Sequence, residues 1–262
     1  MQKLPVSEKL LRECIIDAGK LMLTYYNRDI KVSQKKDLSP LTEADSSVNT
    51  FLQEKLRGFF PDAGWLSEES KDSDERQQKE WVWVVDPLDG TKEFVKRIPE
   101  FTISIALIHN GAPIIGSVYN PSTGEGAVGN VLDKSIESWG KKDVFHDLIV
   151  SRTEFDKPKM TFLRSSGLDI EPIGSVAYKL LLAAIGNANI TFSLEPKSEW
   201  DLCGGVALLQ AAGLEFIKFD DSPVLFNNPD PLITSWTLGG KKKRITEVQT
   251  IIKGNENHLR TL

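Results

Sequence analysis

Residues 81–91 are Trp-Val-Trp-Val-Val-Asp-Pro-Leu-Asp-Gly-Thr, an apolar run that ends in two carboxylates. The leading side chains are β-branched or aromatic, which predicts a buried strand. Asp86 and Asp89 then lie at the carboxyl end of that strand, where α/β proteins place their sites. Pro87 and Gly90 fix an unusual backbone, so a turn is able to aim both acids inward. Because two close carboxylates repel, this arrangement favours a bound divalent cation.

The end of this stretch also suits a phosphate group. Mg²⁺ prefers oxygen ligands and keeps several waters, so carboxylates together with a phosphate match it. Gly90 and Thr91 are predicted to open a helix, and exposed amides at a helix N-terminus bind phosphate. The alternative is a simple capped turn in which Asp89 serves as the N-cap. The aspartyl-nucleophile motif Asp-x-Asp-Gly-Thr is absent, because position 87 is a proline.

The remainder of the chain mixes helical and strand patterns, which predicts a layered α/β or α+β fold. Apolar residues at helical spacing predict helices over residues 7–27, 48–59, 176–184 and 204–212. Short β-rich runs predict strands over residues 102–108, 114–119, 148–150, 161–163, 190–194 and 214–219. Polar stretches predict loops over residues 31–41 and 71–80. A soft boundary near residues 140–142 predicts two halves, 1–142 and 143–262.

Composition narrows the expected partners and compartment. The chain has 262 residues and a net charge of −5, so we expect no nucleic-acid partner. It contains no run of ~18 apolar residues, so we expect no membrane span. The N-terminal stretch lacks the apolar core of a signal peptide, and two cysteines favour a reducing compartment. We therefore expect a cytoplasmic protein, monomeric or homodimeric, that acts on a small molecule.

Two further acidic segments flank the central stretch. Glu68-Glu69 precedes it, and an acid pair taken alone is usually a solvated one. Asp201 follows it, just before a predicted helix that this residue is able to cap. Neither segment by itself indicates a metal site, so their meaning depends on the whole pattern.

The pattern as a whole resembles the inositol monophosphatase superfamily. That family's order and approximate spacing are matched by Glu68-Glu69, residues 86–91 and Trp200-Asp201. The resemblance covers most of the chain, since it extends to residues 39–45, 174–175 and 211–213. It implies a layered α/β/α/β/α sandwich of the inositol monophosphatase and fructose-1,6-bisphosphatase type. The first half would carry most metal ligands, and the second would supply Asp201 and substrate contacts.

The resemblance also implies roles for individual residues around two or three Mg²⁺ ions. The implied metal ligands are Glu68, Asp86, the Leu88 carbonyl, Asp89 and Asp201. The implied catalytic residues are Asp45 and Thr91, which would orient and deprotonate a metal-bound water, and Glu69, which would support the ligands. The implied substrate contacts are Gly90, Thr91, Gly174, Ser175, Lys179, Lys197 and Asp201. Inhibition by lithium is expected for such a site.

Physical chemistry agrees with these implied roles. A bound metal lowers the pKa of its water, and paired metals stabilise the attacking and leaving oxygens of an in-line displacement. Phosphoryl transfer needs mainly positioning and charge neutralisation, so no covalent nucleophile is required. No Ser-His or Cys-His arrangement is evident, and His109, His146 and His258 are scattered along the chain. The sequence therefore predicts a Mg²⁺-dependent phosphatase acting on a small soluble phosphate monoester.

Several residues resemble the 3'(2'),5'-bisphosphate nucleotidase branch in particular. Lys92-Glu93-Phe94 has the pattern of that branch, and so do residues 101–108, Ser151-Arg152, Lys179 and residues 196–201. Lys197 is a candidate contact for a second phosphate, with a plain surface lysine as the alternative. Adenosine 3',5'-bisphosphate, cleaved to AMP and phosphate, is therefore the expected substrate.

One departure from that branch keeps other substrates open. After Ser-Arg the nucleotidases usually continue Ser-His, whereas this chain has Thr153-Glu154. A histidine there would help to hold the nucleotide, so an acid in its place argues against this substrate. Inositol 1-phosphate and sugar phosphates therefore stay as alternatives.

Other classes of function fit the sequence less well. Residues 124–129 match Gly-x-Gly-x-x-Gly, but no amphipathic helix follows, so a loop or hairpin is expected rather than a dinucleotide site. Residues 241–244 form a basic run, which is expected to be solvated. A metal-binding regulatory protein without turnover is the remaining alternative, and the intact set of acids argues against it.

Overall fold

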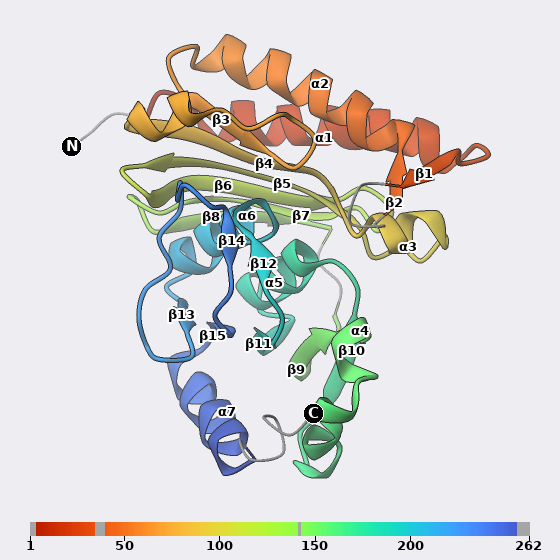
Figure 1. The fold of residues 1–262 in the computed structure, drawn as a ribbon, viewed down its shortest axis with the longest axis vertical. Helices are drawn as coiled ribbons and strands as arrows, with labels where there is room; N and C mark the ends of the chain where they lie inside the picture. Colours follow the sequence, from red (N-terminus) through yellow and green to blue (C-terminus); the bar gives the residue numbers. More distant parts are fainter. Residues whose placement is uncertain (1–3, 35–39, 141–142, 256–262) are drawn as a thin grey trace.

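The computed structural model describes residues 4–34, 40–140 and 143–255, and it contains two large sheets (Figure 1). The six-stranded sheet has the order β3-β4-β5-β6-β7-β8, formed in that order by Gly64–Ser67, Trp81–Asp89, Thr102–His109, Ala112–Asn120, Glu125–Asn130 and Ser135–Trp139. The five-stranded sheet has the order β10-β9-β11-β15-β13, formed by Ile170–Ile173, His146–Ser151, Ala188–Ser193, Thr237–Gly240 and Glu215–Lys218.

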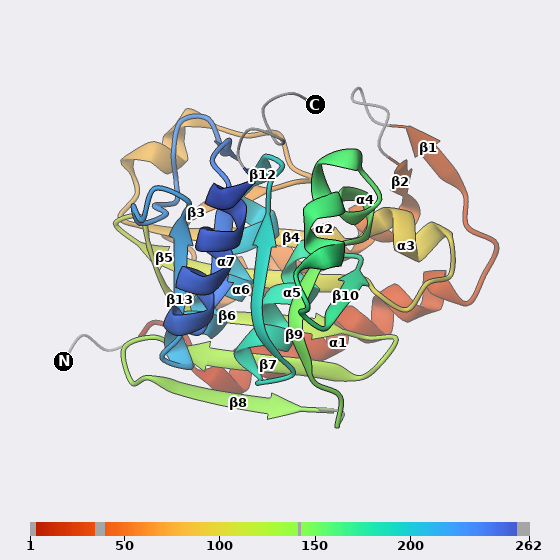
Figure 2. The same ribbon diagram turned by 90° about the horizontal axis from the view of Figure 1, so that it is seen from below.

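The long helices separate and cover these sheets. Helices α1 (Glu8–Tyr26) and α2 (Glu43–Phe59) lie on one face of the six-stranded sheet (Figure 1). Helices α5 (Val176–Ala184) and α6 (Glu199–Ala211) lie between the two sheets. Helix α7 (Lys242–Gly254) packs on the far side of the five-stranded sheet (Figure 2). The layers therefore follow the predicted α/β/α/β/α order, and the predicted fold class is confirmed.

Short elements complete the chain and carry several site residues. Two small antiparallel pairs are formed by β1 (Val32–Gln34) with β2 (Pro40–Thr42), and by β12 (Lys197–Ser198) with β14 (Leu232–Ile233). The short helices are η1 (Asp74–Gln78), α3 (Thr91–Val95), α4 (Arg152–Phe155) and η2 (Pro158–Ser165). No helix among the described residues is long and apolar enough to cross a membrane.

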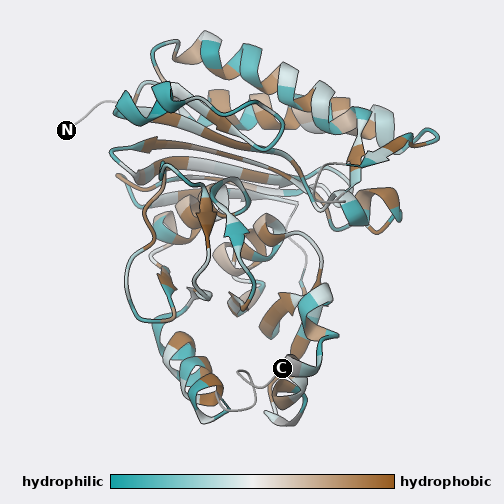
Figure 3. Ribbon diagram, viewed as in Figure 1, coloured by the Kyte–Doolittle hydropathy of each residue, from teal (hydrophilic) through white to brown (hydrophobic). Residues whose placement is uncertain are grey.

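Apolar side chains fill the spaces between the layers. Figure 3 colours the ribbon by hydropathy and shows hydrophobic residues along the strands and helices of these layers. Strand β4 contributes to two of these spaces at once. Its Trp83 and Val85 belong to the cluster under α1 and α2, whereas Val82 and Val84 belong to the cluster around α5 and α6. Successive residues of a strand point to opposite faces, so both faces of β4 are buried, as the sequence predicts.

A β-bulge interrupts β4 where the two acids lie. Asp86 pairs with Ser104 of β5 and Asp89 with Thr102, so β4 advances by three residues where β5 advances by two. Residues three apart in a regular strand point to opposite faces. The extra residue of the bulge brings Asp86 and Asp89 to the same side. The bulge is therefore the local reason that this strand presents two carboxylates together.

Most predicted elements are confirmed, with shifted ends. Ser7 caps α1 by accepting a hydrogen bond from the Leu10 amide at 3.3 Å. The helix predicted over 176–184 matches α5, and the one predicted from 204 begins earlier, at Glu199. The glycine-rich residues 124–129 belong to β7 and its hairpin turn. The basic run at 241–244 opens α7.

Three predictions were wrong. Residues 161–163 are not a strand but part of η2, where Phe162 and Leu163 are buried below the five-stranded sheet. Residues 31–41 are not all loop, because β1 and β2 pair within them; residues 35–39 lie outside the described residues. Residues 71–80 are not all solvated, since η1 forms there and Arg76 is buried. The division into 1–142 and 143–262 stays a prediction.

Candidate active site

Three carboxylates from the two halves of the chain converge at the bulge. Asp86 and Asp89 come from β4, and Asp201 comes from the first turn of α6. One carboxylate oxygen of each residue lies within 4.8 Å of the others. Oxygen-rich clusters of this kind suit hard divalent cations, so these residues fit a metal ion. The cluster joins residues that are more than a hundred positions apart in the sequence, as the sequence predicts.

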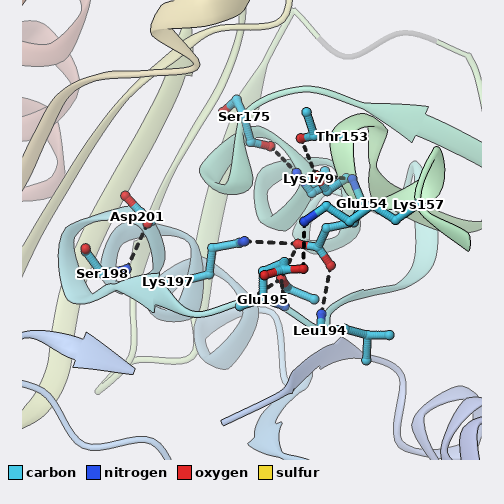
Figure 4. Close-up of polar contacts among 12 residues, drawn as sticks. Thr153, Glu154, Lys157, Ser175, Lys179, Leu194, Glu195, Lys197, Ser198 and Asp201 are labelled. Carbon is cyan, nitrogen blue, oxygen red and sulfur yellow. Dashed lines mark hydrogen bonds and ion pairs between the residues drawn. The ribbon is translucent and has the colours of Figure 1, made fainter. Parts of the chain in front are cut away.

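The first turn of α6 fixes Asp201 through a capping box with Ser198. The Ser198 amide donates a hydrogen bond to Asp201 Oδ2 at 2.9 Å (Figure 4). A residue at this position of a capping box satisfies a free amide and holds its own carboxylate still. The helix-capping role considered for Asp201 is thus present, and it does not exclude a place in the carboxylate cluster.

Burial and mutual repulsion both disfavour the ionised forms of the carboxyls in this cluster. Burial raises the pKa of the Asp86 carboxyl well above its usual range, and the nearby Glu68 carboxylate raises it further. Burial also raises the pKa of Asp89, and raises that of Asp201 to about 8 with Asp89 adding to the rise. Each ionised acid disfavours ionisation of the next, so a cation among them would stabilise the charged forms.

Asp89 is held by the N-terminus of α5. Its Oδ2 accepts hydrogen bonds from Ser175 Oγ and from the Ala177 amide, both at 2.6 Å. Ser175 Oγ also lies 3.0 Å from Thr102 Oγ1 on β5. The hydroxyl proton of Ser175 is thereby directed at Asp89, a contact that the sequence pattern did not indicate. The predicted contact of Ser175 with substrate stays a prediction.

Asp45 and Thr91 meet beside the cluster. Thr91 Oγ1 lies 3.3 Å from Asp45 Oδ1 and 3.2 Å from the Leu88 carbonyl oxygen. Asp45 is fully buried, and its Oδ2 accepts hydrogen bonds from the Thr42 amide at 2.8 Å and from Thr42 Oγ1 at 2.6 Å. The pair comes from α2 and from α3, which Gly90 opens with a left-handed φ of 93°. The fold therefore places the Thr91 hydroxyl within hydrogen-bonding distance of the buried Asp45 carboxylate.

Glu68 and Glu69 lie at the end of β3, which runs parallel to β4. The Glu68 amide donates to the Val85 carbonyl at 3.4 Å, which places Glu68 beside the last residues of β4. Its charge acts on Asp86, as the pKa shift of that residue shows. Glu69 is anchored through its backbone, because its amide donates to Ser67 Oγ at 3.4 Å. A supporting role for Glu69 stays a prediction.

Lys179 braces the segment before α5. It is 3% exposed, and its Nζ donates to the Ser175 carbonyl at 2.6 Å and lies 3.5 Å from the Ile173 carbonyl. Burial lowers the pKa of the Lys179 ammonium to about 8, against the opposing effect of the Asp89 carboxylate. The Gly174 amide within this segment donates to Glu100 Oε2 at 2.6 Å. These contacts fix Gly174 and Ser175, for which the sequence predicts substrate contacts.

The Glu154 side chain is buried and fully engaged with protein groups. It is 2% exposed, and it accepts hydrogen bonds from Ser193 Oγ at 2.6 Å and from the Leu194 amide at 2.8 Å. Lys197 Nζ donates to its Oε1 at 3.0 Å (Figure 4). Lys197 lies in β12, directly before the helix that carries Asp201. Lys197 is therefore not a plain surface lysine.

Two features of this region carry no local sequence signal. Arg152 Nη2 lies 2.7 and 2.6 Å from the two oxygens of Glu100, and so links α4 to the connection between α3 and β5. The Glu199 carboxylate, at the start of α6, is fully buried and bound by backbone amides. Each contact joins residues far apart in the chain, which spacing alone does not reveal.

The sequence of this chain is similar to those of several known proteins. A sequence model of the inositol monophosphatase family matches residues 6–253. The 3'(2'),5'-bisphosphate nucleotidase CysQ of Escherichia coli (strain K12) is 36% identical over 225 residues, which are 79% of this chain and 89% of that protein. The CysQ nucleotidase of Haemophilus influenzae is 28% identical over 248 residues, which cover 88% of this chain and 92% of that protein.

Solved structures share the same fold. The crystal structure of CysQ from Bacteroides thetaiotaomicron, a member of the inositol monophosphatase family, aligns with a TM-score of 0.71 and 28% identity. That alignment covers 90% of this chain and 97% of the other. An inositol monophosphatase from Anabaena (Nostoc) sp. PCC 7120 aligns with a TM-score of 0.75 and 24% identity, over 94% of both chains. At 24% identity, the likeness to the Anabaena protein shows a shared fold and nothing more.

Proposed function

This chain belongs to the inositol monophosphatase family and is a phosphatase, and we propose that its substrate is a 3'(2'),5'-bisphosphate nucleotide. The reaction would convert adenosine 3',5'-bisphosphate and water to AMP and inorganic phosphate. The main support is the carboxylate cluster of Asp86, Asp89 and Asp201, in a chain 36% identical to a nucleotidase over most of its length. A metal-binding protein without turnover would not need the Asp45–Thr91 pair beside that cluster.

The proposed cofactor is Mg²⁺, with two or three ions bound. The proposed ligands are the carboxylates of Glu68, Asp86, Asp89 and Asp201 together with the Leu88 carbonyl. Bound Mg²⁺ would make hydroxide available near neutral pH and neutralise charge on the phosphate. Inhibition by Li⁺ belongs to the same proposal.

The residues of this chain would position the water and take its proton. Thr91 Oγ1 would accept a hydrogen bond from the attacking water, and Asp45 would receive the proton through that hydroxyl. The contacts of Asp45 with Thr42 hold the acid in one orientation. Asp89 would be kept in place by Ser175 and the Ala177 amide, so that the metal ligands do not rearrange during turnover.

Lys197 is the proposed contact for the second phosphate of the substrate. Its side chain is 14% exposed, and one of its three N–H donors is used by Glu154. It lies in β12, four residues before Asp201 of the carboxylate cluster. Glu154 is buried and held by Ser193 Oγ and the Leu194 amide, so its bond to Lys197 orients the lysine side chain and leaves two N–H donors for a phosphate. The Thr153-Glu154 departure is therefore compatible with a bisphosphate substrate.

Lys197→Met is expected to reduce kcat/KM for adenosine 3',5'-bisphosphate by about 10–100-fold, because a charged hydrogen bond is lost. The value for 4-nitrophenyl phosphate, which has no second phosphate, should change by less than about threefold on the same reasoning. Lys157→Met is the matched control, because Lys157 lies nearby and pairs with Glu195 at 2.8 Å (Figure 4). Equal losses on both substrates would argue against the proposed contact.

The substrate itself is tested by phosphate release from adenosine 3',5'-bisphosphate and inositol 1-phosphate, measured side by side with Mg²⁺. We expect kcat/KM to favour the nucleotide by at least about tenfold, because Lys197 adds one charged contact. Li⁺ should inhibit release from both. A preference for inositol 1-phosphate would contradict the proposal and make Glu154 the better guide. Absence of release from either, with Mg²⁺ bound, would also contradict the proposal and leave a sugar phosphate substrate or a regulatory role as the alternatives.

Cellular location and assembly complete the proposal. A cytoplasmic protein, either monomeric or homodimeric, would meet this small soluble substrate directly. The net charge of −5 supports a role away from nucleic acid.

A further inference from the structure

A buried carboxylate sits next to the proposed metal site and takes no part in the chemistry described above. Glu199 is the first residue of α6, two positions before Asp201, and it is 0% exposed. Its Oε2 accepts a hydrogen bond from the Asn227 amide at 2.6 Å. Its Oε1 accepts from the Asn228 amide at 2.8 Å and from Asn228 Nδ2 at 2.6 Å. The chain between β13 and β14 is thereby bound to the start of α6.

A buried arginine holds the other side of the same two asparagines. Arg76 in η1 is 3% exposed, and its Nη1 donates to Asn227 Oδ1 at 2.7 Å while its Nη2 donates to the Asn228 carbonyl at 2.9 Å. Asp72 receives the rest of the guanidinium, at 2.7 Å from Nε and 2.8 Å from Nη2. Figures 1 and 2 show the segment between β13 and β14 reaching up to the six-stranded sheet.

These five residues, Asp72, Arg76, Asn227, Asn228 and Glu199, form a continuous network that we call the latch. Burying a carboxylate and a guanidinium costs free energy unless their hydrogen bonds are satisfied, and here the asparagines satisfy both. Asn227 adopts a left-handed φ of 64°, which asparagine tolerates better than most residues. Buried charges and a left-handed backbone both cost free energy of folding, so the latch is expected to do more than fill space.

The position of the latch supplies that reason. Arg76 lies in the connection that leaves β3 just after Glu68 and enters β4, the strand of Asp86 and Asp89. Glu199 lies at the start of the helix that carries Asp201. The latch thus ties the two segments that bring the proposed metal ligands together from the two ends of the site.

We propose that the latch preorganises the metal site by holding Asp201 against Asp86 and Asp89. Without a cation, three clustered carboxylates repel one another, so the start of α6 tends to move away. A ligand set kept close by other bonds binds its ion more tightly, because less free energy is spent in assembling it. Glu199 and Arg76 are then positioning residues. This inference rests on the metal site proposed above.

Mg²⁺ binding to the whole protein, measured by isothermal titration calorimetry without substrate, tests the latch. Asn228→Ala removes the Nδ2 donor, and Glu199→Gln removes the charge that the amides bind. Each is expected to raise the dissociation constant for Mg²⁺ by about tenfold, the loss that one charged hydrogen bond produces. Turnover should recover to within about twofold at saturating Mg²⁺, since the chemical groups are untouched. Glu75→Gln, an exposed change in the same η1, should alter neither quantity.

The outcomes separate the latch from the metal site itself. If Asp201→Asn leaves Mg²⁺ binding unchanged, the proposed metal site is wrong, and the latch proposal fails with it. If Asp201→Asn abolishes binding but Asn228→Ala and Glu199→Gln lower the melting temperature without changing the Mg²⁺ dissociation constant, the latch merely stabilises the fold, and the inference is overturned. Asn228→Ala removes one side-chain donor and leaves both buried charges in place, so it keeps the test decisive should Glu199→Gln fail to fold.

Discussion

Asp89→Asn is expected to lower kcat for phosphate release by about a thousandfold or more, a loss typical of removing charge that stabilises a transition state. Asp89 is held in one orientation, since Ser175 and the Ala177 amide both bind its Oδ2. The amide of asparagine is neutral, so it would bind a divalent cation more weakly and leave the phosphate charge less neutralised. Phosphate release at several Mg²⁺ concentrations measures the loss.

The melting temperature of Asp89→Asn is a second, independent measurement on this variant. Burial raises the pKa of Asp89 in the folded protein, so its ionised form costs stability at neutral pH. This loss of stability is present when the pH is above the pKa that Asp89 has in the unfolded chain. It disappears when the pH falls below that value. In EDTA at neutral pH, Asp89→Asn should therefore melt at an equal or higher temperature than the parent. Asp62→Asn, an exposed change, is the matched control. Unaltered turnover in Asp89→Asn would refute the proposed metal ligands.

Asp45→Asn is expected to reduce kcat by about 10²–10⁴-fold, the range in which a general base contributes. The asparagine is able to accept the hydrogen bond from the Thr42 amide, so the start of α2 should stay folded. Binding of Mg²⁺ should change little, because Asp45 is not among the proposed ligands. The rate constant kcat, the KM for substrate and the Mg²⁺ dissociation constant are the quantities to measure.

The matched control is Glu43→Gln, which changes an exposed acid in the first turn of the same helix. Glu43→Gln should keep kcat within about twofold, because the Glu43 side chain is exposed and exposed substitutions usually have small effects. A kcat for Asp45→Asn that differs as little from the parent would exclude Asp45 as the acceptor of the water's proton.

The central strand and its acids were predictable because the signal is local. Residues 81–91 contain the buried strand, the two acids and the glycine that opens α3. The bulge between Asp86 and Asp89 was not predicted, because it depends on the register with β5. The strand predicted at 161–163 was wrong because a run of three residues, Thr-Phe-Leu, is too short to distinguish a strand from a helical turn.

The contacts that support the site were largely beyond sequence reasoning. Arg76 lies in a run of charged residues that is typical of a solvated loop, and the residues that bury it are about 150 positions away. Glu154 stood out as a departure from a motif, but its partners Ser193 and Lys197 are supplied by β11 and β12. A buried charge is identified by what surrounds it, and local composition does not contain that information.

The bulge in β4 sets a condition on chain length as well as on side chains. Removing one residue between Asp86 and Asp89 would restore regular pleating and lose the bulge that presents the Leu88 carbonyl to Thr91, and adding one would rotate Asp89 toward the opposite face. The interval of three residues is thus as much part of the site as the carboxylates. A genome-wide search for this chemistry should therefore treat that interval as fixed, while allowing wide variation in the distance from Asp89 to Asp201, which the fold rather than the chain determines.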